Sequence, residues 1–385
     1  MKKRGMRLAV PAGMLLLAGM FLLAGCARYD AASVTVTEPV TEEETRVIRI
    51  EETEAETEPE TEGSRELERI EKDGQIPSYL TGEMTDVAKA NRRPLAIMMS
   101  NDKAALPNYG INHAGVVYEA PVEGGMNRYM AVMEDYDGLE RIGSVRSCRT
   151  YYTYFAREFD AIYAHFGQSV FALPYLEKME HLNGIEGKGS VAFYRSKDRK
   201  APHNAYASFD RIQNAITAMG YSQDYESSYE GHYHFAAPDY PVLLEDGFHA
   251  AVVRPGYQMN NPWFEYHADD GLYYRFQYGG PHNGDEGQLT AKNILFQYCK
   301  WKFYSPSEYL NIDVHTPGTG YYFTNGRGEL ITWNKDGEYG VTRYYDKDGQ
   351  EILLNPGKTW VCIIQADQMD KAEFYGEQTE QTEDR

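Results

Sequence analysis

The strongest constraint on the fold is a succession of short, apolar segments separated by tight-turn signals in the second half of the chain. The turn signals are four Asp-Gly or Asn-Gly pairs, at 270–271, 325–326, 336–337 and 348–349. Such pairs favour two-residue hairpin turns. Residues typical of strands fill the intervening segments, namely 250–253, 263–266, 272–276, 294–298, 321–323, 330–333, 341–345 and 360–364. We therefore expect residues 249–366 to form a mostly antiparallel β domain, as a sandwich or a barrel.

Residues 91–222 show a different pattern, in which strand-like and helix-like segments alternate. Apolar runs at 94–99, 115–118, 129–133 and 160–166 predict buried strands. Helical spacing of apolar residues follows Arg149, and Ser208 is placed to cap a helix with the stripe Phe209, Ile212, Ile216 and Met219. This alternation predicts an α/β layered domain. The fold class is therefore α+β, with the polar residues 223–248 as a connection between the two domains.

The N-terminus has the pattern of an export signal. A cationic start (Lys2, Lys3, Arg4 and Arg7) precedes one apolar stretch that ends in a small-residue site, Leu23-Ala24-Gly25-Cys26. The stretch is short for a retained span, which needs roughly 20 apolar residues. The four residues resemble the bacterial lipobox. This implies that residues 1–25 are removed and that Cys26 carries diacylglycerol and further acyl chains such as palmitate. We expect a lipid-anchored protein on the extracytoplasmic face of the cell membrane.

Residues 26–90 are strongly acidic. Between Asp30 and Glu71 there are fifteen acidic and four basic residues, which is −11 of the chain's net charge of −20. Such a segment buries too little apolar surface to offset its ordering entropy, and like charges extend it. We expect a disordered tether over 26–90 and a second acidic tail over 367–385.

Several motifs of the folded part resemble the YerB family of bacterial lipoproteins. They are 93–101 (RPLAIMMSN), 114–120 (AGVVYEA), 123–125 (EGG), 128–131 (RYMA), 141–149 (RIGSVRSCR), 199–204 (RKAPHN), 288–293 (QLTAKN), 318–321 (GTGY) and 354–360 (LNPGKTW). One departure is Ser144, where the family tends to have Pro. The resemblance implies an N-terminal and a C-terminal domain and a Gram-positive source. It implies no activity, because the function of the family is unknown.

Several functional classes lack support in the sequence. The dinucleotide, P-loop, zinc-protease and nucleophile-elbow motifs are missing, and the acidic balance argues against nucleic acid. His232 and His234 have the spacing of two metal ligands, but no third ligand is evident. The widely spaced Cys148, Cys299 and Cys362 are interpreted as buried small hydrophobes. We therefore expect neither a cofactor nor a metal.

One polar cluster could bind a ligand. Arg146, Ser147 and Arg149 lie at a predicted helix N-terminus, where backbone N–H groups and guanidinium forks favour an anion. The anion could be an internal carboxylate, Glu119 or Glu123, or a ligand such as a stem-peptide carboxylate or a wall-polymer phosphate. The predicted ligand site is a groove between the two domains, formed by Arg128, Arg146, Ser147, Arg149, Glu119, Glu123, His203 and Asn204.

The favoured function is a membrane-anchored protein that binds an anionic or glycan ligand of the cell envelope, or an envelope protein. One alternative is a wall-acting hydrolase or transferase, in which Glu119 or Glu123 acts with His165 or His203. A second alternative is an assembly or signalling lipoprotein that docks proteins through an exposed aromatic face. The Tyr and Trp residues of the second domain could stack on sugars, but they are equally typical of strands.

Overall fold

The computed structural model describes residues 65–376. The predicted signal peptide, Cys26 and the first part of the predicted tether lie outside the described residues, as do the last residues of the predicted tail. No helix of residues 65–376 is long and apolar enough to cross a membrane.

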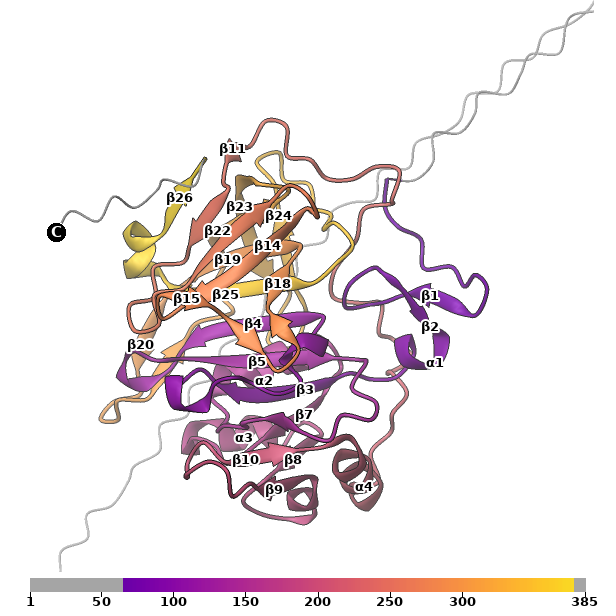
Figure 1. Cartoon of the computed structure of the whole chain (residues 1–385), viewed down its shortest axis with the longest axis vertical. Helices are drawn as coiled ribbons and strands as arrows, with labels where there is room; N and C mark the ends of the chain where they lie inside the picture. Colours follow the sequence, from indigo (N-terminus) through magenta and orange to yellow (C-terminus); the bar gives the residue numbers. More distant parts are fainter. Residues whose placement is uncertain (1–64, 377–385) are drawn as a thin grey trace, which may run out of the picture. The chain divides into compact units, whose positions relative to one another are not determined.

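One mixed sheet of eleven strands runs through both halves of the described chain (Figure 1). Its strands follow the order β11-β23-β22-β19-β25-β4-β5-β3-β7-β8, and β24 pairs with β23. The two halves meet where β4 (Val116–Pro121) pairs in parallel with β25 (Thr359–Gln365). The predicted α+β class is confirmed, with a mixed sheet in the first half and mostly antiparallel pairs in the second. The two domains nevertheless share one sheet.

Both faces of this sheet are covered. Along β3 (Leu95–Ser100), Leu95, Ile97 and Met99 belong to one core cluster, and the alternate residues Ala96 and Met98 belong to the other. This is the period of two expected for a strand with both faces buried. Helix α4 (Phe209–Met219) packs into the first cluster, and helix α2 (Thr150–Arg157) packs into the second.

A second sheet has the order β15-β14-β13-β12-β26, with β18 paired to β14. Phe264 of β13 and Tyr273 of β14 share a core cluster with Ile294 and Phe296 of β19. The second half is therefore two packed sheets, as the hairpin pattern predicts. The glycines of the four predicted turns have positive φ angles, from 69° at Gly271 to 77° at Gly349, which a glycine adopts without steric cost.

The remaining elements are short. The helices are α1 (Val87–Ala90) and α3 (Leu173–Leu176). The strands are β1 (Gln75–Pro77), β2 (Met84–Asp86), β5 (Asn127–Met133), β6 (Ile142–Gly143), β7 (Ile162–His165), β8 (His181–Asn183), β9 (Phe193–Arg195), β10 (Ala205–Ala207), β11 (Phe248–His249), β12 (Val252–Arg254), β13 (Trp263–His267), β14 (Leu272–Gln277), β15 (Gly280–Pro281), β16 (Asn283–Gly284), β17 (Gly287–Gln288), β18 (Thr290–Ala291), β19 (Asn293–Cys299), β20 (Trp301–Phe303), β21 (Leu310–Ile312), β22 (Gly318–Thr324), β23 (Arg327–Lys335), β24 (Thr342–Tyr345) and β26 (Glu373–Tyr375).

Three local predictions need correction. Residues 65–90 are structured, with Ile76 and Leu80 buried beside the β1–β2 hairpin, so the predicted tether extends too far. The start of the predicted acidic tail is also structured, because β26 pairs with β12. Ser208 is the N-cap residue of α4, but its side chain makes no capping hydrogen bond. The tether and tail predictions followed local acidity, although apolar residues there contribute to the core or to a strand.

A buried charged cluster links α2 to the second half. The fully buried Glu158 forms an ion pair with Lys335 of β23 and accepts hydrogen bonds from the backbone N–H of Thr342, at 3.2 Å, and from its hydroxyl, at 3.0 Å. His232 Nε2 lies 3.2 Å from Glu158 Oε2 and 3.0 Å from the Thr342 carbonyl. Two acceptors at one nitrogen require an N–H there, as in a neutral imidazole. Burial lowers the pKa of His232 to about 4, although Glu158 acts in the opposite direction.

We predict that His232 makes stability pH-dependent. Its ordinary pKa is 6.5 and its folded pKa is about 4, so the unfolded chain binds the additional proton between these values. The stabilising contribution is present above pH 6.5 and is lost as the pH falls toward 4. In urea unfolding, His232→Gln should lower the slope of unfolding free energy against pH by up to about 1.4 kcal/mol per pH unit.

His234→Gln is the matched control, because His234 is partly exposed and pairs with Glu66 and Glu351. If both variants keep the wild-type slope between pH 4 and 6.5, His232 is not the group responsible.

Candidate functional site

The buried carboxylate of Glu119 is the centre of a polar network between the two domains. Glu119 lies on β4 and is fully buried. Its Oε2 accepts hydrogen bonds from Arg275 Nη2 at 2.7 Å and from Trp360 Nε1 at 3.1 Å. Its Oε1 accepts from the Nδ2 atoms of Asn127, at 2.9 Å, and Asn260, at 3.2 Å. Four donors around one carboxylate satisfy a charge that would otherwise be too costly to bury.

Arg275 extends this network toward His282. Burial disfavours the charge of Arg275, but Glu119, together with Tyr129 and Cys362, outweighs it and raises the pKa of the guanidinium. Arg275 Nη1 donates to His282 Nδ1 at 2.7 Å. Burial and the nearby guanidinium hold the pKa of His282 well below its usual value. The network therefore contains one ion pair and a neutral imidazole, besides the three neutral donors around Glu119.

These contacts correct the catalytic prediction for Glu119. A fully buried carboxylate with four donors cannot reach a polymeric substrate, and its hydrogen-bond partners do not include His165 or His203. His165 is itself buried, with Nδ1 2.8 Å from the Gly167 carbonyl and Nε2 3.0 Å from His181 Nδ1. Burial lowers the pKa of His165 to about 3. We therefore assign Glu119 and His165 to the packed interior.

Glu123 forms the predicted ion pair with Arg149. Arg149 Nε and Nη2 donate to the Glu123 carboxylate at 2.9 Å and 2.6 Å, in a bidentate arrangement. The backbone N–H of Leu310 adds a hydrogen bond at 3.2 Å. Burial would raise the pKa of Glu123, but these bonds and the Arg149 charge lower it. The internal-carboxylate interpretation is thus confirmed for Arg149, with Glu123 as its partner, and Glu119 pairs with Arg275.

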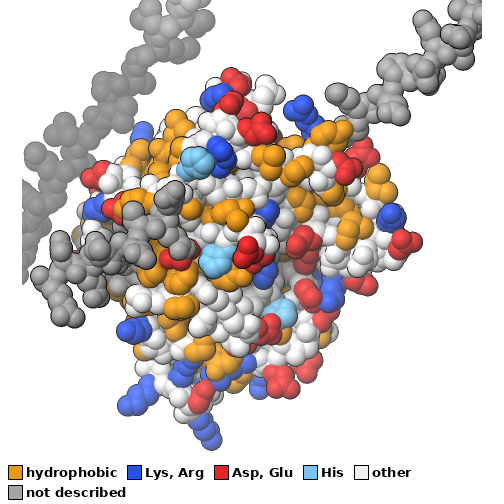
Figure 2. Space-filling view, turned by 45° about the horizontal axis from the view of Figure 1, so that its top comes forward, with side chains coloured by type: hydrophobic (Ala, Val, Ile, Leu, Met, Phe, Trp, Pro, Cys, Tyr) orange, Lys and Arg blue, Asp and Glu red, His pale blue; other side chains and the backbone are white. Residues whose placement is uncertain are grey.

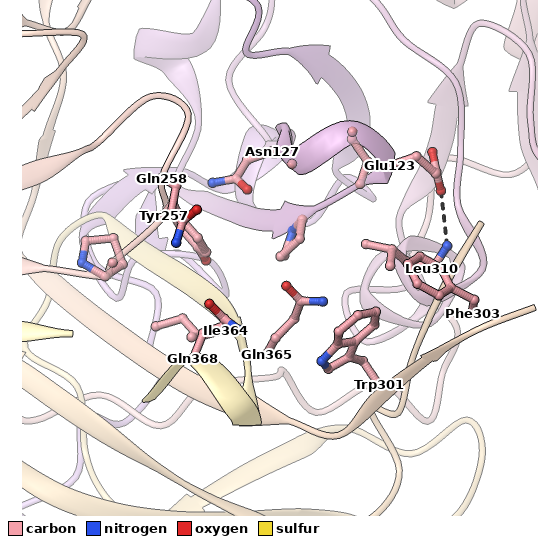
Figure 3. Close-up of a pocket in the computed structure, with 16 residues that line it drawn as sticks. Glu123, Asn127, Tyr257, Gln258, Trp301, Phe303, Leu310, Ile364, Gln365 and Gln368 are labelled. Atoms are coloured by element: carbon pink, nitrogen blue, oxygen red, sulfur yellow. Dashed lines mark hydrogen bonds between the residues drawn. The ribbon is translucent and has the colours of Figure 1, made fainter. Parts of the chain in front are cut away.

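A pocket of about 330 Å³ opens beside Glu123, and we call it the junction pocket (Figure 3). Residues of both domains line it: 121–125 and Asn127 from the first, and 255–258, Trp301, Phe303, Leu310, 364–365 and Gln368 from the second. The pocket thus lies between the two domains, as the predicted site does, but of the predicted ligand residues only Glu123 lines it. Its walls include Glu123, but neither Arg146 nor Arg149 lines it.

The junction pocket combines amide and aromatic side chains. Gln258 and Gln365 have solvent-accessible side chains that make no hydrogen bond with another residue in the described part of the chain, and both are drawn at the pocket in Figure 3. Trp301 and Phe303 form one wall, with ring centroids 5.2 Å apart, and Phe303 is 50% exposed. Glu123 is the one carboxylate among the lining residues. The walls thus offer free amides and ring faces but no net charge once Arg149 is counted.

The other predicted ligand residues gather outside this pocket. Arg128 Nη1 donates to the Ser147 carbonyl at 2.6 Å, and Arg146 Nη1 donates to the Pro202 carbonyl at 3.0 Å. His203 follows Pro202, and its Nε2 lies 3.9 Å from Asp102 Oδ1. Asn204 is committed to a turn, since it donates to the Ser196 carbonyl at 3.1 Å. The structure therefore divides the predicted site between two places.

His232 and His234 have the spacing of two metal ligands, but their side chains lie in different surroundings. His232 is buried and His234 is partly exposed. Among residues 65–376, no three His, Cys, Asp or Glu side chains are grouped as a metal site would require. Cys148, Cys299 and Cys362 are free and buried, and burial raises the pKa of the Cys148 thiol to about 12.

On the face drawn in Figure 2, acidic and basic side chains are interspersed.

Comparison with known proteins identifies the class. Two family models match, "Protein of unknown function (DUF3048) N-terminal domain" over residues 80–222 and its C-terminal counterpart over residues 252–361. The two matches together span more than half of the chain, in the order the fold requires. The chain belongs to this two-domain family of unknown function.

One relative is YerB, as the motifs suggest. The protein named "Putative lipoprotein YerB" of Bacillus subtilis (strain 168) is 29% identical over 302 residues, which cover 75% of this chain and 86% of the relative. The crystal structure of Bacillus subtilis YerB matches with a TM-score of 0.66 and 28% identity, over 77% of this chain and 99% of that chain. The resemblance to the YerB family is therefore confirmed.

We predict that the Glu119–Arg275 pair is a structural requirement of the domain junction. Arg275→Met removes the cation and leaves a buried carboxylate with neutral donors only, so the free energy of unfolding should fall by about 3–5 kcal/mol. Chemical denaturation of the purified protein measures this loss. Arg254→Met is the control, because Arg254 is partly exposed and lies over the Trp263 ring at 5.1 Å. Equal, small losses in both variants would contradict a structural role for the pair.

Proposed function

We propose that the chain is a membrane-anchored extracytoplasmic lipoprotein that binds an uncharged, amide- and hydroxyl-bearing part of the cell-envelope glycan in the junction pocket. The observation that carries the proposal is the lining of this pocket. The free amides of Gln258 and Gln365 match hydroxyl and acetamido groups, while Trp301 and Phe303 offer ring faces to a sugar. The volume of about 330 Å³ is at the lower end for small-molecule sites. This size suits about one sugar unit of a longer strand.

The electrostatics of the pocket favour binding over hydrolysis. Glycoside hydrolysis usually requires two carboxyl groups, one of them a general acid with a raised pKa. Glu123 is the one carboxylate in the lining, and Arg149 helps to lower its pKa. This supports a binding protein over the alternative of a hydrolase or transferase that uses Glu123 with His203.

The membrane location rests on Cys26 and the lipoprotein relative. The lipobox-like Leu23-Ala24-Gly25-Cys26 follows the apolar stretch of a signal peptide, and the relative YerB is named as a lipoprotein. Two or more acyl chains give durable anchoring. Residues between Cys26 and Arg65 would then connect the membrane to the described domains.

The anchor is tested by metabolic labelling in a bacterial host that processes lipoproteins. A palmitate analogue should label the wild-type protein, and Cys26→Ser should abolish the label because the acceptor thiol is lost. Cys148→Ser should keep it, since Cys148 is buried inside the fold. A label that persists in Cys26→Ser would refute the anchor site.

Glycan binding is tested by sedimentation of the full-length protein, in detergent, with purified peptidoglycan freed of other polymers. The double variant Gln258→Ala/Gln365→Ala loses up to two hydrogen bonds of about 1 kcal/mol each. It should therefore bind up to about thirtyfold more weakly, and Trp301→Ala should also weaken binding.

Gln350→Ala is the control, because Gln350 is exposed in the turn after β24 and outside the junction pocket. Released muropeptides are measured in the same tubes. Wild-type binding by the folded double variant would overturn the pocket assignment, and fragment release would support the enzymatic alternative.

A further inference from the structure

Arg128 is a buried cation without a counter-ion. Its side chain belongs to β5 and the residue is 8% exposed. The Nη1 atom donates to the Ser147 carbonyl at 2.6 Å, while Nε is buried and has no partner among residues 65–376. No carboxylate of this part of the chain lies within ion-pair distance of Arg128. A buried guanidinium in this state is costly unless a negative group completes it.

Two further arginines lie close to Arg128. Segment 144–146 hydrogen-bonds along β3, with Ser100 N–H donating to the Ser144 carbonyl at 3.0 Å and Arg146 N–H to the Met98 carbonyl at 3.0 Å. On its other side, β3 pairs with β5, where Ser100 is opposite Arg128. Burial, together with the charges of Arg149 and Arg146, lowers the pKa of Arg128 to about 10. The three guanidinium groups therefore share one local field.

The carboxylates near this cluster are already engaged. Glu123 accepts hydrogen bonds from Nε and Nη2 of Arg149. Asp102 acts on Arg146 and lies near His203, but it also caps a short helical turn by accepting a hydrogen bond from the Ala104 N–H at 2.8 Å. His203 Nδ1 is buried and unpartnered within the described chain. Positive charge and free donors thus exceed the available acceptors.

The N-terminus of α2 adds to the same field. Helix α2 begins at Thr150, directly after Arg149, and the N-cap residue makes no side-chain capping bond. The first N–H groups of a helix lack intrahelical partners and carry a partial positive charge. Arg128 is joined to this turn through the Ser147 carbonyl. The helix end and the buried Arg128 Nε, which has no partner among residues 65–376, are two separate observations that favour the same kind of ligand.

We propose that Arg128 and Arg146, with the N-terminus of α2, form a binding site for a phosphoryl group, separate from the junction pocket. Arg128 lies at the buried end and the half-buried Arg146 lies nearer solvent. The donors come from β5, from the segment after β6 and from α2. A tetrahedral phosphoryl group presents oxygens in several directions, whereas a carboxylate presents two oxygens in one plane. Arginine forks are well suited to phosphate.

The test uses the full-length protein in detergent and inorganic phosphate as the probe, at constant ionic strength with chloride as the exchanged anion. Phosphate should raise the thermal midpoint of the wild type, because a ligand that binds only the folded state stabilises it. Arg146→Ala should bind phosphate at least about tenfold more weakly in calorimetric titration, as expected for a lost hydrogen bond to a charged group. Arg211→Ala should behave as wild type, since Arg211 is exposed on α4.

Arg128→Met separates a binding role from a structural one. Without phosphate, its thermal midpoint should equal or exceed that of the wild type, because an uncompensated buried charge is removed. Phosphate should then give no increase. A large loss of stability in phosphate-free buffer would show that the Arg128 charge supports the fold by itself, and would overturn the proposal.

A second probe, a glycerol phosphodiester, distinguishes the source of the group. Tighter binding of the diester indicates a phosphodiester polymer, and tighter binding of inorganic phosphate indicates a free ion; both support the site. Binding of neither probe, or equal gains in wild type and Arg146→Ala, would refute it. Since the site lies outside the junction pocket, loss of glycan binding in the Gln258→Ala/Gln365→Ala variant leaves this result unaffected.

Discussion

The parallel pairing of β4 with β25 is the interaction on which the rest of the structure depends. Val116 to Glu119 pair in register with Thr359 to Cys362, and this contact turns two shorter sheets into one. It also brings Trp360 to the Glu119 carboxylate. Parallel sheets are usually buried on both faces, and here the helices and the second sheet provide that cover. The network around Glu119 and the junction pocket both lie beside this pairing.

Two buried carboxylates of this molecule are each paired with a buried cation. Glu119 and Glu158 are fully buried, and each has a cation from the second half of the chain, Arg275 and Lys335 respectively. These pairs link parts of the chain that are far apart in sequence. Arg128 is a contrasting case, because it is buried beside two other arginines and no carboxylate of residues 65–376 lies within ion-pair distance of it.

Local signals in the sequence predicted much of the fold. The Asp-Gly and Asn-Gly turns, the alternating apolar residues and the stripe of α4 depend on neighbouring residues only, so the main strands and helices were predictable. The order of strands in the sheet was not, because β4 and β25 are selected by register and packing over a long separation. The acidic composition around Glu66 and Glu71 obscured the apolar residues Ile76 and Leu80, which decide that this segment folds.

The site was predictable only where charge gave a signal. An excess of arginines after Ile142 required acidic partners, which led to Glu119 or Glu123; only the structure assigns Glu123 to Arg149. Arg275 and Lys335 lie in strands that look ordinary in sequence, so the partners of Glu119 and Glu158 could not be assigned. The amides of Gln258 and Gln365 belong to no motif, and their common pocket exists only because the domains meet there.

The shared sheet also has a consequence for the order in which the chain can fold. As the chain is made from its N-terminus, β4 is complete long before residues 359–365 exist. Until they arrive, the outer edge of β4 has no partner strand, and Glu119 lacks both Arg275 and Trp360. An open strand edge invites pairing with other chains, and long-range parallel pairing forms slowly. The N-terminal domain therefore exposes an unpaired strand edge until its C-terminal half is made, even though the two domains are distinct in sequence.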